Sequence, residues 1–317
     1  MFDRAGLLAQ LAEGAPVIRV VIAEVKGSSP REVGAAMLVW RDAQGALRQS
    51  GTIGGGALEH LATQAAQDML TTGAMRRFDR YPLGPAIGQC CGGAVALLSE
   101  RYADGVTLPE TVMARPATGD APMPLAVKRL LVAQRGQGVM PQAQLLQGWF
   151  IEPVARPSRQ LWVWGAGHVG RALVSVLAPL PEVAITWVDT GIERFPETIP
   201  AGVTMLPAAD PALVVAYAPQ GAEHIVLTYS HALDLELCHR IMTHGFAALG
   251  VIGSATKAAR FRARLHDLGH LPVEIQRIAC PIGDRSLGKH PQAIALGVAT
   301  AFLKRADAPE NRQEKAG

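Results

Sequence analysis

A glycine-rich hexapeptide, GAGHVG at 165–170, directly follows a short apolar run at 161–164 and precedes a helix-like segment. This G-x-G-x-x-G spacing between a strand and a helix is typical of the turn that opens a nucleotide-binding βαβ unit. Downstream, apolar strand-like segments alternate with helix-like segments as far as a helix that begins at Ala255. Alternation of this kind indicates a parallel sheet with helices on both faces. We therefore predict an α/β protein in which residues 160–317 form a doubly wound, Rossmann-like domain.

The rest of the chain predicts a smaller domain and a connector. In 1–104, an amphipathic helix ended by Gly73 and several β-rich runs indicate an N-terminal α+β domain. We expect its strands at 17–25, 36–40, 46–50, 75–81 and 93–98 and its helix at 57–72. Residues 105–159 hold repeated prolines and weak apolar periodicity, which predict a long connector with one short helix at 126–134. Two domains also fit the length of 317 residues, because that length exceeds what one core usually supports.

The glycine turn predicts a phosphate site in the C-terminal domain. Its glycines allow a tight turn and a close backbone approach, and the helix that starts there offers unpaired N–H groups to a phosphate. A carboxylate about 20 residues further on can hold a ribose hydroxyl. The candidate ligand residues of this motif are Gly165, Gly167, His168, Gly170 and Asp189. The alternative is a fold that keeps the turn geometry without using the ligand.

Further candidates follow other predicted strands, at the edge where ligands of doubly wound sheets bind. His231 is a candidate contact, although its neighbours Ser230 and Asp234 can equally be the N-cap and a first-turn carboxylate of a helix. Ser254 and Lys257 open another helix and could bind an anion there. The alternative for Lys257 is a solvated basic face with the arginines that follow it.

Glycines and thiols also mark the N-terminal domain. A loop at 83–93 holds two adjacent thiols, which are soft ligands or nucleophiles, although two small buried residues in a turn are the alternative. Three successive glycines precede the 57–72 helix and favour ligand contact, because a plain turn does not need them. Cys280 could bring another thiol to the sheet edge of the C-terminal domain, whereas Cys238 is expected in the core. The candidate contacts in the N-terminal domain are Gly54, Gly55, Gly56, Gln89, Cys90 and Cys91, with the two thiols as candidate metal contacts.

Composition and charge exclude several classes of partner. Basic residues exceed acidic ones only in 101–160, and no basic run is interleaved with aromatics, so we expect no nucleic acid. No apolar stretch reaches the roughly 18 residues of a membrane span, and no signal-peptide pattern opens the chain. We therefore expect no membrane partner and a cytoplasmic location, which also fits four cysteines without a disulfide framework. The 49% hydrophobic and 18% charged content favours a homodimer.

These motifs together resemble the XdhC/CoxI family. In the N-terminal domain the resemblance rests on GSSPR at 27–31, IGGGALE at 53–59 and GQCCGG at 88–93. In the C-terminal domain it rests on GAGHVG at 165–170 and CPIG at 280–283, and on the residues Ser230, His231, Asp234, Ser254 and Lys257. The resemblance spans nearly the whole chain.

The resemblance implies a carrier of the molybdenum cofactor that is not itself an enzyme. Proteins of this kind bind the molybdopterin cofactor as cargo, protect it, present it to a cysteine desulfurase for sulfuration and insert it into apo xanthine dehydrogenase. In this interpretation Cys90 and Cys91 contact the metal–sulfur end, while 165–170 and Asp189 hold the phosphate end. No catalytic residue is assigned, because the chain has no Walker lysine, H-E-x-x-H, G-x-S-x-G or paired C-x-x-C motif. The alternatives are an NAD(P)-dependent oxidoreductase that uses the GAGHVG turn, and a thiol-based metal or redox protein.

Overall fold

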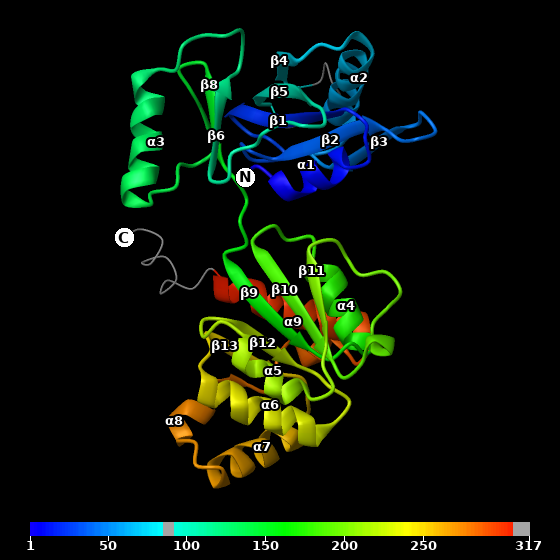
Figure 1. The fold of residues 1–317 in the computed structure, drawn as a ribbon, viewed down its shortest axis with the longest axis vertical. Helices are drawn as coiled ribbons and strands as arrows, with labels where there is room; N and C mark the ends of the chain where they lie inside the picture. The colour runs from blue at the N-terminus through cyan, green and yellow to red at the C-terminus, as the bar shows by residue number, and fades with distance from the viewer. Residues whose placement is uncertain (85–91, 307–317) are drawn as a thin grey trace. The chain divides into compact units, whose positions relative to one another are not determined.

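The chain divides into two compact units, Met1–Ala155 and Arg156–Gly317, in a computed structural model that describes residues 1–84 and 92–306. Figure 1 shows the elements of both units. The elements of the first unit are α1 (Arg4–Leu11), β1 (Val17–Lys26), β2 (Ala36–Arg41), β3 (Leu47–Gly51), α2 (Gly56–Thr72), β4 (Arg76–Pro82), β5 (Ala94–Tyr102), β6 (Val112–Pro116), α3 (Leu125–Gln137), β7 (Gln144–Leu146) and β8 (Trp149–Pro153).

A five-stranded antiparallel sheet of order β3-β2-β1-β5-β4 forms the main part of the first unit. In β1, Ile18, Val20 and Ile22 point to one face and pack against α2. Val21 and Ala23 point to the other face and pack with Phe150 of β8. Side chains alternate along a strand, so the unbroken apolar run of β1 reflects burial on both of its faces.

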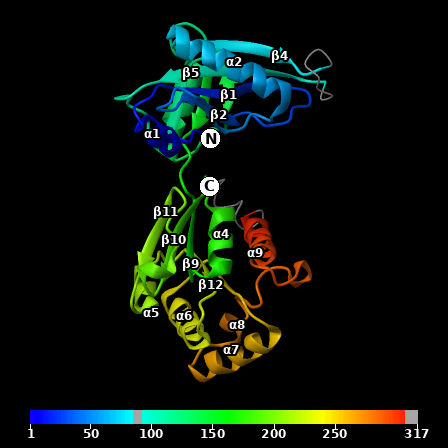
Figure 2. The same cartoon turned by 90° about the vertical axis from the view of Figure 1, so that its right-hand side faces the viewer.

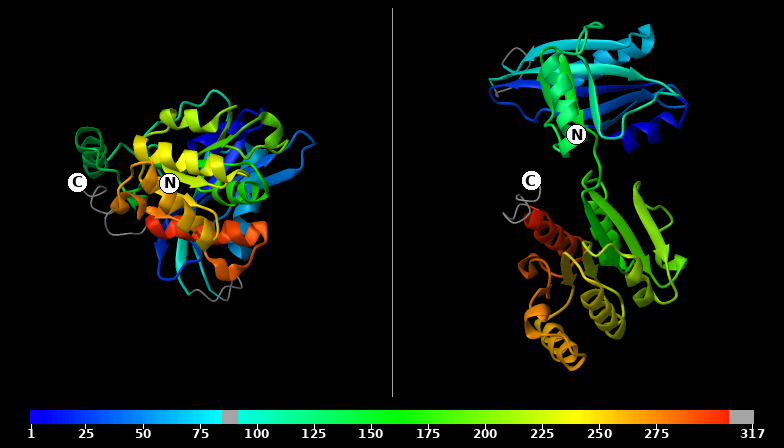
Figure 3. Two further views of the ribbon diagram at one scale, coloured as in Figure 1. Left: turned by 90° about the horizontal axis from the view of Figure 1, so that it is seen from below. Right: turned by 60° about the vertical axis from the view of Figure 1, so that its left-hand side comes forward.

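The segment expected to be a proline-rich connector, 105–159, holds a second sheet of order β6-β8-β7 with α3 packed on it. Figure 3 shows α3 lying along these strands. Its prolines lie at element ends, because Pro116 ends β6, Pro153 ends β8 and Pro124 is the N-cap of α3. Proline is compatible with these positions, so the same residues that indicate a connector also punctuate short strands and a helix.

A buried ion cluster joins the two sheets of the first unit. Both terminal nitrogens of Arg19 in β1 donate to Glu152 in β8, at 2.8 and 2.9 Å. Arg115 of β6 donates to Glu152 at 2.7 Å and to Glu100 of β5 at 2.8 Å. Burial alone would raise the pKa of Glu152, but the attraction of Arg19 and Arg115 outweighs it and lowers that pKa. The small sheet is therefore an integral layer of the first unit.

The second unit is a six-stranded parallel sheet covered by helices on both faces (Figure 2). Its elements are β9 (Arg159–Trp164), α4 (His168–Leu177), β10 (Val183–Asp189), η2 (Ile192–Arg194), β11 (Val203–Pro207), α5 (Pro211–Val214), η3 (Val215–Tyr217), β12 (Glu223–Val226), α6 (His231–His244), β13 (Ala248–Val251), α7 (Ala255–Asp267), α8 (Pro272–Ile275), β14 (Ile278–Ala279), η4 (Arg285–Leu287) and α9 (Pro291–Ala306). The strand order is β11-β10-β9-β12-β13-β14, with every neighbouring pair parallel. The predicted fold class, a doubly wound sheet with an N-terminal α+β part, is confirmed.

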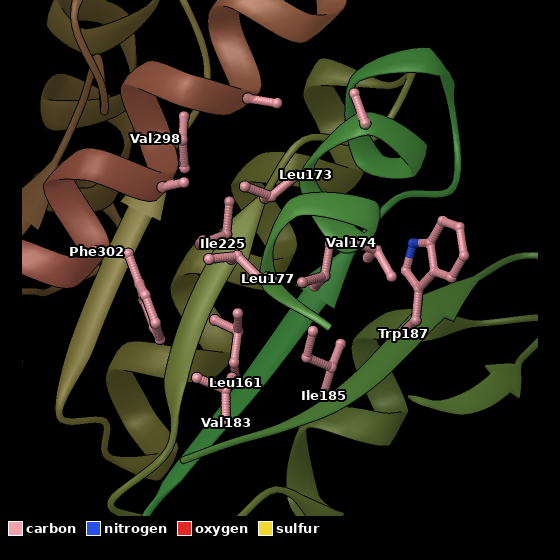
Figure 4. Close-up of a cluster of buried hydrophobic side chains, with 14 of the residues drawn as sticks. Leu161, Leu173, Val174, Leu177, Val183, Ile185, Trp187, Ile225, Val298 and Phe302 are labelled. Carbon is pink, nitrogen blue, oxygen red and sulfur yellow. The ribbon is translucent and has the colours of Figure 1, made fainter. Parts of the chain in front are cut away.

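Two apolar layers hold this sheet. On one face Leu161 of β9 and Ile225 of β12 pack against Leu173 of α4 and Phe302 of α9, as Figure 4 shows. On the other face the alternate residues of β9, including Trp164, pack against α6. Burial on both faces explains the continuous apolar run at 161–164 in β9. Among the described residues, no helix has the length and apolar character needed to cross a bilayer.

Candidate functional site

The strand order opens a crevice at the carboxyl edge of the second unit. β9 lies between β10 and β12, so the chain leaves β9 and β12 toward opposite ends of the sheet. Ligands of doubly wound sheets bind at such a switch point. A crevice of about 300 Å³ lies here, lined by Val169, Leu227, Thr228, Tyr229, His231, Ile252, Gly253, Ser254 and Lys257.

The three glycines of the GAGHVG turn have three different environments. Gly165 has a φ of +123°, and a Cβ there would lie 2.6 Å from the carbonyl oxygen of Leu227, so the turn requires glycine. A Cβ on Gly170 would overlap the carbonyl oxygen of Gly165, so glycine lets α4 pack closely on the strand end. A Cβ on Gly167 would meet no atom within 4 Å. The backbone at Gly167 is therefore open to a ligand at the N-terminus of α4, which suits a phosphate.

Asp189, at the end of β10, uses its carboxylate to hold this turn. Its Oδ2 accepts the N–H of Ala166 at 2.6 Å, and its Oδ1 accepts the N–H of Thr190 at 2.6 Å. Arg194 lies 3.6 Å from Oδ1, and the Asp189 residue is only 4% exposed. The sequence predicts a carboxylate at this position that can reach a ribose hydroxyl. In the structure, both of its oxygens instead accept hydrogen bonds from the chain.

His168 begins α4, but its side chain does not line the crevice. It lies instead in an open depression of about 500 Å³ that it shares with Arg171 and His290. Of the GAGHVG residues, Val169 lines the crevice, whereas His168 faces this second depression.

Lys257 is a buried ion-pair partner of Asp234. Its Nζ donates to Asp234 at 2.5 Å and to the carbonyl of Ile252 at 2.9 Å. The other oxygen of Asp234 accepts the N–H and the hydroxyl of Thr228, at 3.0 and 2.7 Å. Lys257 is 8% exposed and Asp234 is fully buried, so Lys257 does not belong to a solvated basic face. The pair ties the first turns of α6 and α7 to the ends of β12 and β13, and so fixes the crevice walls.

His231, Ser254 and Tyr229 lie at the surface of the crevice. Ser254 caps α7 by accepting the N–H of Lys257 at 3.1 Å, and Ser230 caps α6 in the same way. The His231 side chain is exposed and makes no cap. Sequence reasoning missed Tyr229, which is 69% exposed with the Arg194 guanidinium over its ring at 4.9 Å. Its position just after a strand end was the only signal for it.

The crevice continues into a groove of about 620 Å³ between α6 and α7. His231, Ser254 and Lys257 line both hollows. Arg260 and Arg264 lie one turn apart on the wall of the groove, and neither has an ion-pair partner within 1–84 and 92–306. The carboxyl edge thus continues into a concave surface of mixed charge, where Arg260 and Arg264 lie together with Glu236 and Asp267.

The Gly54–Gly56 turn of the first unit is held by a carboxylate that sequence reasoning did not single out. All three glycines have positive φ, of 122°, 74° and 64°, which explains the run of glycines. Glu59 of α2 accepts the N–H groups of Ile53 at 3.1 Å and Gly55 at 3.0 Å. Burial raises the pKa of Glu59, but these bonds and those from nearby side chains outweigh it and lower that pKa. Two amides that an anion could bind are therefore already used.

Three motif-bearing segments converge beside this turn. A Cβ on Gly54 would lie 2.7 Å from the ring of Pro30, and one on Gly93 would overlap the carbonyl of Ser28. Leu83 donates its N–H to Gly93 at 2.7 Å. The segments 27–31, 52–56 and the flank of the thiol loop thus lie side by side. Gln89, Cys90 and Cys91 themselves lie outside the described residues.

The other two cysteines differ in exposure. Cys238 is buried in the core, as expected, and burial raises the pKa of its thiol. Cys280 follows β14 and is partly buried, which also raises the pKa of its thiol. The part of the chain that the structure describes has no group of three His, Cys, Asp or Glu residues arranged to hold a metal ion.

Comparison with family models matches both units. Residues 161–301 match the XdhC Rossmann domain, and residues 10–81 match the XdhC and CoxI family. Together these stretches make up more than half of the chain. The chain belongs to the XdhC and CoxI family. This confirms the family that the glycine and cysteine motifs indicate.

Two known proteins are similar over most of this XdhC-family chain. The molybdenum cofactor insertion chaperone PaoD of Escherichia coli strain K12 is 26% identical over 91% of this chain and 83% of PaoD. A Bacillus halodurans protein, whose crystal structure is described as that of a xanthine dehydrogenase, superposes with a TM-score of 0.67 at 18% identity. That match covers 97% of this chain and 98% of the other, and it supports the fold.

Proposed function

We propose that this XdhC-family protein is a carrier that binds the molybdenum cofactor as cargo and inserts it into an apo molybdenum enzyme. The similarity to PaoD, which is named as a molybdenum cofactor insertion chaperone, supports this role. We further propose that the client is xanthine dehydrogenase, that a cysteine desulfurase sulfurates the bound cofactor, and that the carrier is a homodimer in the cytoplasm. In this proposal the protein is not itself an enzyme.

The observation that carries the proposal is that the GAGHVG turn has an open backbone at Gly167, while the carboxylate of Asp189 is bound to the chain. The open backbone at Gly167 suits a phosphate, which the molybdopterin cofactor has. An NAD-dependent enzyme also uses a carboxylate near this turn for the ribose 2′-hydroxyl. Both oxygens of Asp189 are instead bonded to Ala166 and Thr190. A phosphate cradle whose nearby acid is already bound to the chain supports a cargo held through its phosphate over NAD, which also uses that acid.

The remaining candidate residues have distinct roles in this proposal. His231 and Ser254 contact the cargo from the crevice wall, while Lys257 shapes that wall through Asp234. Cys90 and Cys91 supply soft sulfur donors for the metal–sulfur end, because thiolates match the softness of that group. Gln89 and the backbone of Gly54–Gly56 are proposed as further contacts of the cargo.

The Gly167→Ala variant tests the phosphate cradle. Gly167 has an ordinary φ of −71° and space around it, so alanine is compatible with the fold but obstructs the ligand. We expect the dissociation constant for the cofactor to rise about tenfold, or ~1.4 kcal/mol, with an unchanged melting temperature. Anaerobic fluorescence titration with extracted molybdenum cofactor measures this.

The matched control is Gly221→Ala. Gly221 also has open space around it, but it precedes β12 and so lies at the opposite edge of the sheet. The control should bind like the wild type. Equal cofactor affinity in the wild type and both variants would refute the cradle at Gly167, and tight NAD(P)H binding by the wild type would instead favour the oxidoreductase.

A further inference from the structure

Helix α3 of the first unit has one face without a partner. Its inner face packs on the small sheet through Val127 and the neighbouring Leu130 and Leu131. On its outer face Leu125 is 61% exposed and Val132 is 58% exposed. Single exposed apolar residues are ordinary, but two on one stripe of a 13-residue helix form a surface that water solvates poorly.

The outer face is hollowed rather than flat. A depression of about 530 Å³ is lined by residues of α3 alone, among them Leu125, Arg129, Val132, Ala133 and Gly136. Positions 125, 129, 132 and 136 follow the i, i+4, i+7, i+11 spacing of one helical stripe. The small residues Ala133 and Gly136 leave room for side chains of another helix, as in the packing of ridges into grooves.

The charges around the depression all have the same sign. Lys128 and Arg129 line it, Arg135 lies about two turns beyond Lys128, and α3 has no acidic residue. None of these three cations has an ion-pair partner within the described ranges of the chain. The stretch that contains them, 101–160, is also where basic residues exceed acidic ones. The complementary surface is therefore apolar with acidic flanks.

We propose that the outer face of α3 docks an amphipathic helix of the client enzyme, with acidic residues on either side of its apolar stripe. A second copy of this chain does not fit, because pairing two α3 faces would bring like charges together without a compensating acid. A lipid surface fits less well, because membrane-surface helices present bulky residues whereas this face is hollowed at Ala133 and Gly136.

The size of the surface suits a short-lived complex. Thirteen residues make a helix of about 20 Å, which accommodates roughly one partner helix of equal length. Contacts of this size are at the low end for protein complexes and are usually transient. Because exposed cations supply part of the attraction, binding should weaken with salt. A carrier that must release its cargo needs such a contact.

The test measures binding of the full-length carrier to purified apo xanthine dehydrogenase, so it depends on the proposed function for its choice of client. We expect Lys128→Glu with Arg129→Glu, and separately Val132→Asp, to weaken this binding at least ~10-fold in low salt. Cofactor retention and the melting temperature should not change. Matched controls are Arg262→Glu and Leu213→Asp, which are exposed sites on the second unit and should bind the client normally.

Three outcomes would overturn the docking surface. The first is normal binding of the client by the α3 variants. The second is a change in self-association alone, measured by sedimentation. The third is a loss of binding to phosphatidylserine vesicles alone. A wild type that binds no cofactor would instead refute the carrier function. The two failures can be distinguished because cofactor retention and client binding are measured separately.

Discussion

Three charged side chains near the candidate sites interact with the chain itself rather than with solvent, namely those of Asp189, Lys257 and Glu59. Asp189 bonds Ala166 and Glu59 bonds Gly55, so both carboxylates fix glycine turns. Lys257 pairs with Asp234. The sequence places each residue near a predicted ligand edge, because strand and helix ends can be located from apolar periodicity. It cannot show which oxygens or cations remain free, since that depends on contacts between segments distant along the chain.

His224 of β12 is a buried histidine held in its neutral form. Its Nδ1 accepts the indole N–H of Trp164 at 3.2 Å, and the two rings stack with centroids 6.0 Å apart. Burial lowers the pKa of His224 from 6.5 to about 3. The unfolded chain therefore binds a proton below pH 6.5 that the folded chain does not bind, so stability is full above 6.5 and falls as the pH is lowered toward 3.

This difference predicts a measurable pH dependence. Between pH 7 and pH 5 the wild type should lose about 2 kcal/mol of unfolding free energy through His224. The His224→Gln variant keeps an acceptor for Trp164 but cannot titrate. Its unfolding free energy should therefore not fall by this amount between the two pH values. Urea unfolding of both proteins at the two pH values measures the difference. Parallel pH slopes would show that His224 titrates normally in the folded protein.

At the scale of elements, periodic patterns predict most of the second unit. Most strands after 160 are largely apolar and alternate with helices, which is typical of a sheet buried on both faces. The small sheet of the first unit could not be predicted in this way. Its strands β6, β7 and β8 are at most five residues long and end at prolines or turns, so they show no clear period.

The ion cluster that attaches this small sheet is also absent from local sequence patterns. Arg19 and Glu152 are 133 residues apart, and only the fold brings them together. Replacing Glu152 by Gln leaves the buried guanidinium of Arg19 without its carboxylate, while Arg115 keeps Glu100, and it should reduce the unfolding free energy by ~3–5 kcal/mol. Chemical denaturation measures the loss, and hydrogen exchange at β6 and β8 shows whether it is local.

The exposed pair Arg240 and Glu236 provides a control for the cluster. These side chains are both 43% exposed and lie one turn apart on α6. Glu236→Gln should cost no more than ~0.5 kcal/mol, because water screens an exposed pair. An equal cost for the two substitutions would contradict a structural role for the buried cluster.

At the scale of the whole molecule, the two units each carry a glycine-rich turn fixed by a carboxylate. The motifs of both units predict the family from sequence, because the fold requires glycine at particular positions. Gly54 and Gly165 have positive φ, and Gly170 is closely packed. The function depends on a further property, which is whether the turn at Gly167 holds the cofactor. No sequence pattern distinguishes that cargo from a dinucleotide, since both bring a phosphate to the same helix start.

Anaerobic gel filtration of the wild-type protein distinguishes the two ligands. The protein is incubated with molybdenum cofactor in one sample and with NADH or NADPH in another, and the protein peak is analysed for pterin and for nicotinamide. If the protein is a carrier, pterin elutes with the protein in proportion to its amount, and nicotinamide does not. Retention of NADH or NADPH without any pterin would contradict the carrier function.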